Sequence, residues 1–114
     1  MERKLKDSVA ILLAHIIKVD NRDVEKEAPL FCKLMGEDFD CDPDEAKRIL
    51  EKVMAEPYEL DAHIETIAEA LRDDRLSKYH LLEQINHIIY SDQIAPHDYE
   101  IFEKIKKRLF EAEV

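Results

Sequence analysis

Apolar side chains recur at helical spacing along almost the whole chain, and only one glycine interrupts them. In the first segment Leu5, Val9, Leu12 and Ile16 follow one another at intervals of three or four residues. This spacing places them on one face of an α-helix. A single Gly and four Pro in 114 residues leave few of the residues that β-turns require. The sequence therefore predicts an all-α protein.

Six helical segments can be delimited in this way. They are 2–19, 24–35, 60–72 and 78–90, one that opens at Pro43 and stops near Pro57, and one that opens at Pro96. Asp42 before Pro43 is a strong helix start, with Glu45 three residues after the cap. Gly36 is expected to end the second helix at its C′ position. We expect one domain over residues 1–114, a bundle of about six helices.

The chain is strongly acidic, with a formal net charge of −10. This charge argues against nucleic-acid binding and against docking on anionic lipid, which both require a basic surface. Basic protein partners or divalent cations are the natural complements. The apolar N-terminal stretch is broken by His15 and Lys18, and no run reaches the ~18 apolar residues of a membrane span. We therefore expect a cytoplasmic protein without a membrane span.

A short string occurs twice, as HIIKVD (15–20) and HIIYSD (87–92). Each copy falls in the last turn of a predicted helix, with its Asp just beyond the end. An acid-bearing helix start follows both times. The repeat is therefore interpreted as a pseudo-duplicated unit of helix, acidic turn and helix. His and Asp within one copy would point roughly 140° apart on a helix, so they do not form a chelating pair by themselves.

The acids of each repeated unit offer a better pairing across the turn. Asp20 pairs with Glu27 at the first corner, and Asp92 with Asp98 at the second. Each pair would bring two carboxylates to a helix–helix corner, as a divalent cation requires. Helix capping is the alternative, because Asp initiates turns and acids in a first helical turn favour the helix dipole. For either corner taken alone, capping is the simpler interpretation.

The segments KVDNRDVEKE (18–27) and YSDQIAPHDYEIF (90–102) also carry a family resemblance. In this respect the chain resembles the TerB-like family, first associated with tellurite resistance and also found at the N-terminus of a membrane-anchored DnaJ-type co-chaperone. The family pattern is an apolar helix, then Asp-Gly and acids that open the next helix, twice per domain. Asn21 and Gln93 stand where the family has Gly. The resemblance implies a helical domain that binds divalent metal through these acids.

The expected function is that of a small acidic binding or adaptor domain in a stress-response setting, with an unidentified protein partner. The metal ligands would be Asp20, Glu27, Asp92 and Asp98, holding Ca²⁺, Mg²⁺, Mn²⁺ or Zn²⁺. One alternative is a metal-dependent enzyme that uses the same paired carboxylates. The other is a structural interaction domain without metal. The enzyme has less support, since no serine lies in a Gly-flanked elbow and no phosphate-binding loop is present. The sequence leaves the oligomeric state open.

Overall fold

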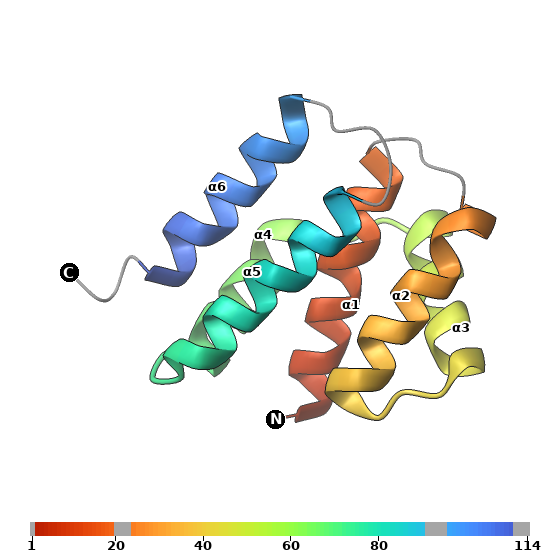
Figure 1. Ribbon diagram of the computed structural model, residues 1–114, viewed down its shortest axis with the longest axis horizontal. Coiled ribbons are helices and arrows are strands. Elements are labelled where there is room, and N and C mark those ends of the chain that lie inside the picture. The colour runs from red at the N-terminus through yellow and green to blue at the C-terminus, as the bar shows by residue number, and fades with distance from the viewer. Residues whose placement is uncertain (1, 20–23, 91–95, 111–114) are drawn as a thin grey trace.

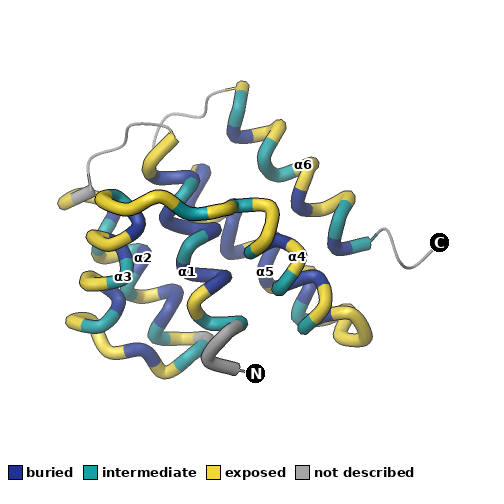
Figure 2. Tube along the Cα trace, turned by 180° about the vertical axis from the view of Figure 1, so that it is seen from behind, coloured by how far each residue is buried: buried dark blue, intermediate teal, exposed yellow. Residues whose placement is uncertain are grey.

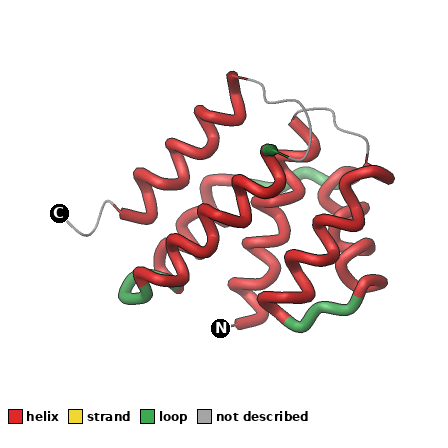
Figure 3. Tube along the Cα trace, viewed as in Figure 1, coloured by secondary structure: helices red, strands yellow, loops and turns green. Residues whose placement is uncertain are grey.

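The computed structural model describes residues 2–19, 24–90 and 96–110, and within these ranges it contains six α-helices and no strand (Figures 1 and 3). In chain order they are α1 (Glu2–Val19), α2 (Val24–Phe39), α3 (Pro43–Ala55), α4 (Leu60–Ala70), α5 (Arg75–Ile89) and α6 (Pro96–Phe110). The prediction of an all-α bundle of about six helices is confirmed.

Helix α1 is the centre of the bundle. It packs against α2, α3, α4 and α5, whereas α6 lies on the outside against α4 and α5. Figure 1 shows α2 and α3 on one side of α1, and α5 and α6 on the other. The described residues have extents of 40 × 32 × 25 Å. A central helix surrounded in this way must be apolar on most of its circumference.

The sequence of α1 meets this requirement. Leu12, Leu13, Ile16 and Ile17 are all fully buried, and Ala10 and Ala14 let neighbouring helices approach closely. Figure 2 shows buried positions along most of α1 and along only one face of α6. The other helices each turn a narrower stripe toward the same core, represented by Phe31, Met35, Leu50, Ile67, Ile85 and Ile105.

Two helix starts are fixed by aspartate caps. A side-chain oxygen of Asp42 accepts a hydrogen bond from the Glu45 backbone amide at 2.8 Å, as the sequence predicts for α3. Asp74 does the same for α5, with Ser77 N at 3.0 Å and Ser77 Oγ at 2.6 Å. Helix α5 therefore begins at Arg75, three residues before the predicted start, because the Asp74 side chain caps the helix at that earlier point.

Helix α2 does not end before Gly36, so the prediction of a C′ glycine is wrong. The helix continues to Phe39, and the left-handed conformation falls on Asp40, with φ 53°. Phe39 packs against the core, and this contact keeps the last turn helical beyond Gly36. Asp tolerates the left-handed region better than most residues. Pro29 also lies inside α2, so this proline does not delay the start of the helix.

The ends that flank the two repeated turns lie on the same side of the molecule. Figure 1 shows the last turns of α1 and α5 and the first turns of α2 and α6 toward the top of the view, and Figure 2 shows them there from behind. The first turn of α1 and the last turn of α2 lie at the opposite end. Among the described residues, no helix has the length and apolar character that crossing a bilayer demands.

Candidate functional site

Two of the predicted ligands are buried carboxylates in the first turns of helices. Glu27, in α2, is 2% exposed, and Asp98, in α6, is 0% exposed. Acids are common in first helical turns, where the dipole favours them at the surface. Fully buried Asp and Glu are rare, because removing their charge from water is costly. The burial of both residues therefore exceeds what a surface cap requires.

The other two predicted ligands, Asp20 and Asp92, lie outside the described residues. Each follows a helix whose end is described, α1 at Val19 and α5 at Ile89. Within residues 2–19, 24–90 and 96–110, no three His, Cys, Asp or Glu side chains gather closely enough to hold a metal ion. The four-residue ligand set accordingly stays a prediction.

His15, the histidine of the first repeat, belongs to a polar network on the side of α1. Its Nδ1 atom lies 2.5 Å from the hydroxyl oxygen of Tyr58, and the two rings meet edge to face at 5.6 Å. Lys18 Nζ lies 5.0 Å from the centre of the Tyr58 ring and donates to the Val53 carbonyl at 3.4 Å. Burial, and then the charges of Lys18 and Lys104, lower the pKa of His15. His15 is thus half-buried and hydrogen-bonded, as expected of a histidine at the edge of the core.

A second histidine lies beside a serine of α1. Ser8 Oγ is 2.9 Å from Nδ1 of His63 in α4. A Ser–His contact of this length is also found in nucleophilic enzymes. Ser8, however, is 2% exposed and lies within the body of α1, so a substrate has no access to its oxygen. The pair therefore joins α1 to α4 and gives the buried hydroxyl its hydrogen bond.

A cavity lies at the end of the bundle where α1 begins, opposite the first turns of α2 and α6. Its volume is ≈ 910 Å³. Its lining includes Leu5, Lys6 and Val9 in the first half of α1, together with residues at the end of α2 and in the first two thirds of α5. The α1 residues that line the cavity end at Val9, so the second half of α1 separates them from the last turn of that helix, where the first repeated segment begins.

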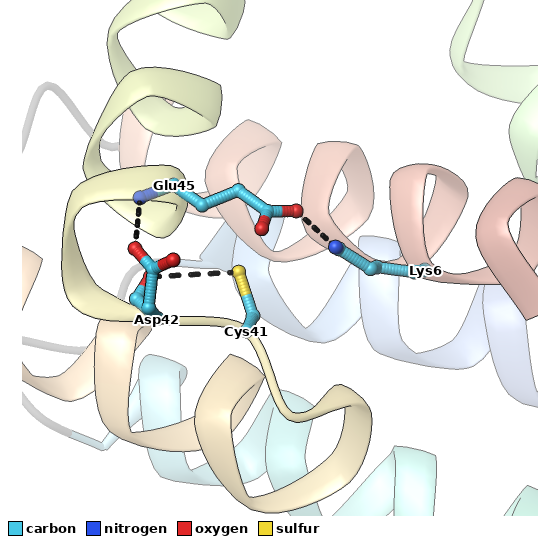
Figure 4. A network of polar contacts seen from close by, with 4 residues as sticks. All are labelled: Lys6, Cys41, Asp42 and Glu45. Carbon is cyan, nitrogen blue, oxygen red and sulfur yellow. Dashed lines mark hydrogen bonds and ion pairs between the residues drawn. The ribbon is translucent and has the colours of Figure 1, made fainter.

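A polar network borders this cavity (Figure 4). Lys6 of α1 forms an ion pair and hydrogen bond with Glu45 in the first turn of α3, which raises the pKa of Lys6. The same Glu45 donates its backbone amide to Asp42, the cap of α3. Cys41 precedes this cap, and burial raises the pKa of its thiol, which is thereby kept protonated. The network ties α1 to the turn between α2 and α3.

Sequence reasoning did not find this cavity. Its lining comes from α1, α2, α3, the α4–α5 turn and α5, and no local motif in these segments indicates a cavity. The feature that could have indicated this region is the ion pair between Lys6 and Glu45, the acid at the start of α3. That pairing spans 39 residues and becomes visible only after the helices have been packed together.

The helical architecture and the two repeated corners agree with one known family. The sequence profile of the family described as "Tellurite resistance protein TerB" matches residues 6–107. The chain belongs to the TerB family. Comparisons with curated proteins and with solved structures gave no match.

The TerB match extends from the second turn of α1 into the last turn of α6, so it includes both repeated acidic segments and every residue that lines the cavity except Leu5. The resemblance to TerB-like domains that the repeated segments indicate is thus confirmed for nearly the whole chain. Family membership characterises the protein as a helical domain of the tellurite-resistance type. Fold and family do not by themselves assign an activity, which must come from the site.

Proposed function

We propose that this TerB domain is an acidic binding or adaptor module of a stress response, and that it binds a divalent cation at its helix–helix corners. The observation that carries the proposal is the burial of Glu27 and Asp98 at corresponding places, each in the first turn after a repeated acidic segment. Asp20 and Asp92 supply the second carboxylate of each pair in the sequence. The net charge of −10 favours cations over anions throughout.

Carboxylate oxygens suit hard cations. Ca²⁺ takes six to eight oxygen ligands, and Mg²⁺ takes six including water. A cation between two carboxylates also relieves their mutual repulsion. The first corner is the better equipped, since Asp23 and Glu25 stand near Asp20 and Glu27 in the sequence, and Asn21 suits the left-handed turn that the family gives to Gly.

Titration calorimetry of the metal-free protein with Ca²⁺, Mg²⁺, Mn²⁺ and Zn²⁺ tests the proposal. We expect saturable binding of at least one ion, and a rise in melting temperature when that ion is in excess. Asp20→Asn should weaken binding more than Asp92→Asn does. Glu69→Gln, which neutralises an exposed acid of α4, is the matched control and should leave the affinity unchanged.

The capping interpretation makes a different prediction for the same variants. Asn caps helices and turns about as well as Asp. Both substitutions would then change the melting temperature only slightly and leave ion affinity untouched. A wild-type protein whose melting temperature responds to none of the four ions would end the cation proposal for both corners.

A further inference from the structure

The cavity beside the first half of α1 has the size of a binding site, and both polar and apolar side chains line it. Its ≈ 910 Å³ lie near the upper limit of the roughly 300–1,000 Å³ that is typical of ligand pockets. Apolar side chains from three helices and the α4–α5 turn line it: Leu5, Val9, Phe39, Leu71 and Leu81. This lining suits an apolar side chain, which would leave water on entering.

Acidic groups surround the apolar lining. Glu37 and Asp40, at the end of α2, both line the cavity and are exposed to solvent. The lining includes one lysine, Lys6, whose charge is compensated by its ion pair with Glu45. The cavity therefore favours a positively charged occupant, in agreement with the charge of the whole chain.

A buried amide in the wall adds a hydrogen-bond requirement. Gln84 of α5 lines the cavity and is 3% exposed. Its Nε2 atom has no hydrogen-bond partner among the described residues. Buried donors are normally paired, and this atom is covered in the free protein, so an acceptor from outside reaches it only if the Gln84 side chain turns into the cavity. A backbone carbonyl of an incoming peptide is such an acceptor.

The surface next to the cavity extends the apolar contact. Leu76 is 83% exposed, one helical turn before His80, which lines the cavity. Residues four apart lie on the same face of a helix, so Leu76 borders the opening. A small molecule within the cavity would leave Leu76 in water, whereas an extended peptide chain would cover the cavity and Leu76 together.

We propose that this cavity is the docking site for a short segment of a partner protein, with an apolar side chain inserted between α2 and α5 and a Lys or Arg beside it. The apolar side chain packs on Leu5 and Val9, the basic residue faces Glu37 and Asp40, and a backbone carbonyl accepts a hydrogen bond from Gln84. The site shares no residue with the acidic corners, so it goes beyond the cation proposal and does not depend on it.

Selection of a random heptapeptide library displayed on phage, against the full chain in the presence of EDTA, tests this docking site. We expect the enriched peptides to share an apolar residue with Lys or Arg next to it. In a ¹⁵N-labelled protein, the leading synthetic peptide should shift the side-chain amide signal of Gln84 and the backbone signal of Gly36. Enrichment of acidic peptides, or of none, would overturn the proposal.

Two substitutions test whether the peptide binds in the cavity. Gln84→Leu keeps the volume of a buried side chain and removes the donor, so the leading peptide should bind roughly five- to tenfold more weakly. Glu37→Gln, at an exposed position, should weaken binding roughly two- to threefold, with the matched Glu83→Gln on the outer face of α5 unchanged. Circular dichroism checks that each variant is folded. Unchanged affinity in both folded cavity variants would contradict the proposal, whatever ions the acidic corners bind.

Discussion

The two copies of the His-Ile-Ile string show how one sequence is used in two places. In α1 and in α5, both isoleucines are buried: Ile16 and Ile17 at 0%, Ile88 at 0% and Ile89 at 2%. The histidines differ. His15 is half-buried and bonded to Tyr58, whereas His87 is exposed on α5.

The cause of this difference is the number of neighbouring helices. Helix α1 packs against α2, α3, α4 and α5, whereas the main neighbours of α5 are α1, α2 and α6. The side of α1 that carries His15 is covered by Tyr58, which lies between α3 and α4. A repeated string therefore determines which residues face the core, but the surrounding helices determine the environment of the remaining face. That α1–α2 and α5–α6 superpose as duplicated units stays a prediction.

The largest expected effect is the loss of unfolding free energy when a buried isoleucine of either copy is replaced by alanine. Ile16→Ala and Ile88→Ala each remove a fully buried side chain, which typically costs about 2–5 kcal/mol of unfolding free energy. We expect the greater loss for Ile16→Ala, because a cavity within a helix enclosed by four others has less freedom to collapse. Urea denaturation measures both, and Ile→Val at each site is the milder control. Equal losses of unfolding free energy would contradict the expected difference between α1 and α5.

A smaller effect is expected at Tyr58. Tyr58→Phe keeps the ring beneath Lys18 and removes the hydroxyl that contacts His15, so it should cost about 1 kcal/mol of unfolding free energy. Tyr79→Phe on α5, where the ring is half-exposed, is the matched control and should cost little. Indistinguishable urea midpoints for these variants would show that the His15 contact adds no stability.

The pH dependence of stability should distinguish the two histidines further. Burial lowers the pKa of His15 in the folded protein below its ordinary value of 6.5. The unfolded chain then takes up the proton at a higher pH than the folded one. The stabilising contribution of His15 is therefore complete above pH 6.5 and is lost as the pH falls through the folded-state pKa.

Melting temperatures between pH 8 and pH 5 (about one unit or more either side of the ordinary His pKa) measure this contribution. His15→Asn should flatten the acid side of the profile, and the matched His87→Asn should leave it as in the wild type. A profile that His15→Asn does not alter would assign the acid sensitivity to other groups, the carboxylates first among them.

The smallest expected effect is a gain in stability. Gly36 lies within α2 at a helical φ, and an added Cβ would meet the Cys41 carbonyl oxygen at 3.4 Å, an ordinary contact. Because glycine inside a helix is costly, Gly36→Ala should stabilise the protein by about 0.5 kcal/mol. Thermal unfolding measures this gain. A loss of stability would mean that the first repeated unit requires glycine at this position.

Much of the fold could be predicted from the sequence because its determinants are local. The apolar spacing of α1, the Asp42-Pro43 start of α3 and the Pro96 start of α6 each lie within a few residues of the feature that they determine. The candidate corners could be predicted for the same reason, as a string of acids after a helix. The burial of Glu27 and Asp98 could not, because it depends on helices that approach from elsewhere in the chain.

The sequence by itself determined an acidic protein of six helices, since periodicity and capping act over single turns of chain. Only the tertiary structure decided the end of α2, where contact of Phe39 with the core outweighs the preference of Gly36. It alone distinguished His15 from His87, and it alone assembled the cavity around Gln84. Each of these depends on contacts between residues far apart in the chain, and such contacts leave no local pattern to read.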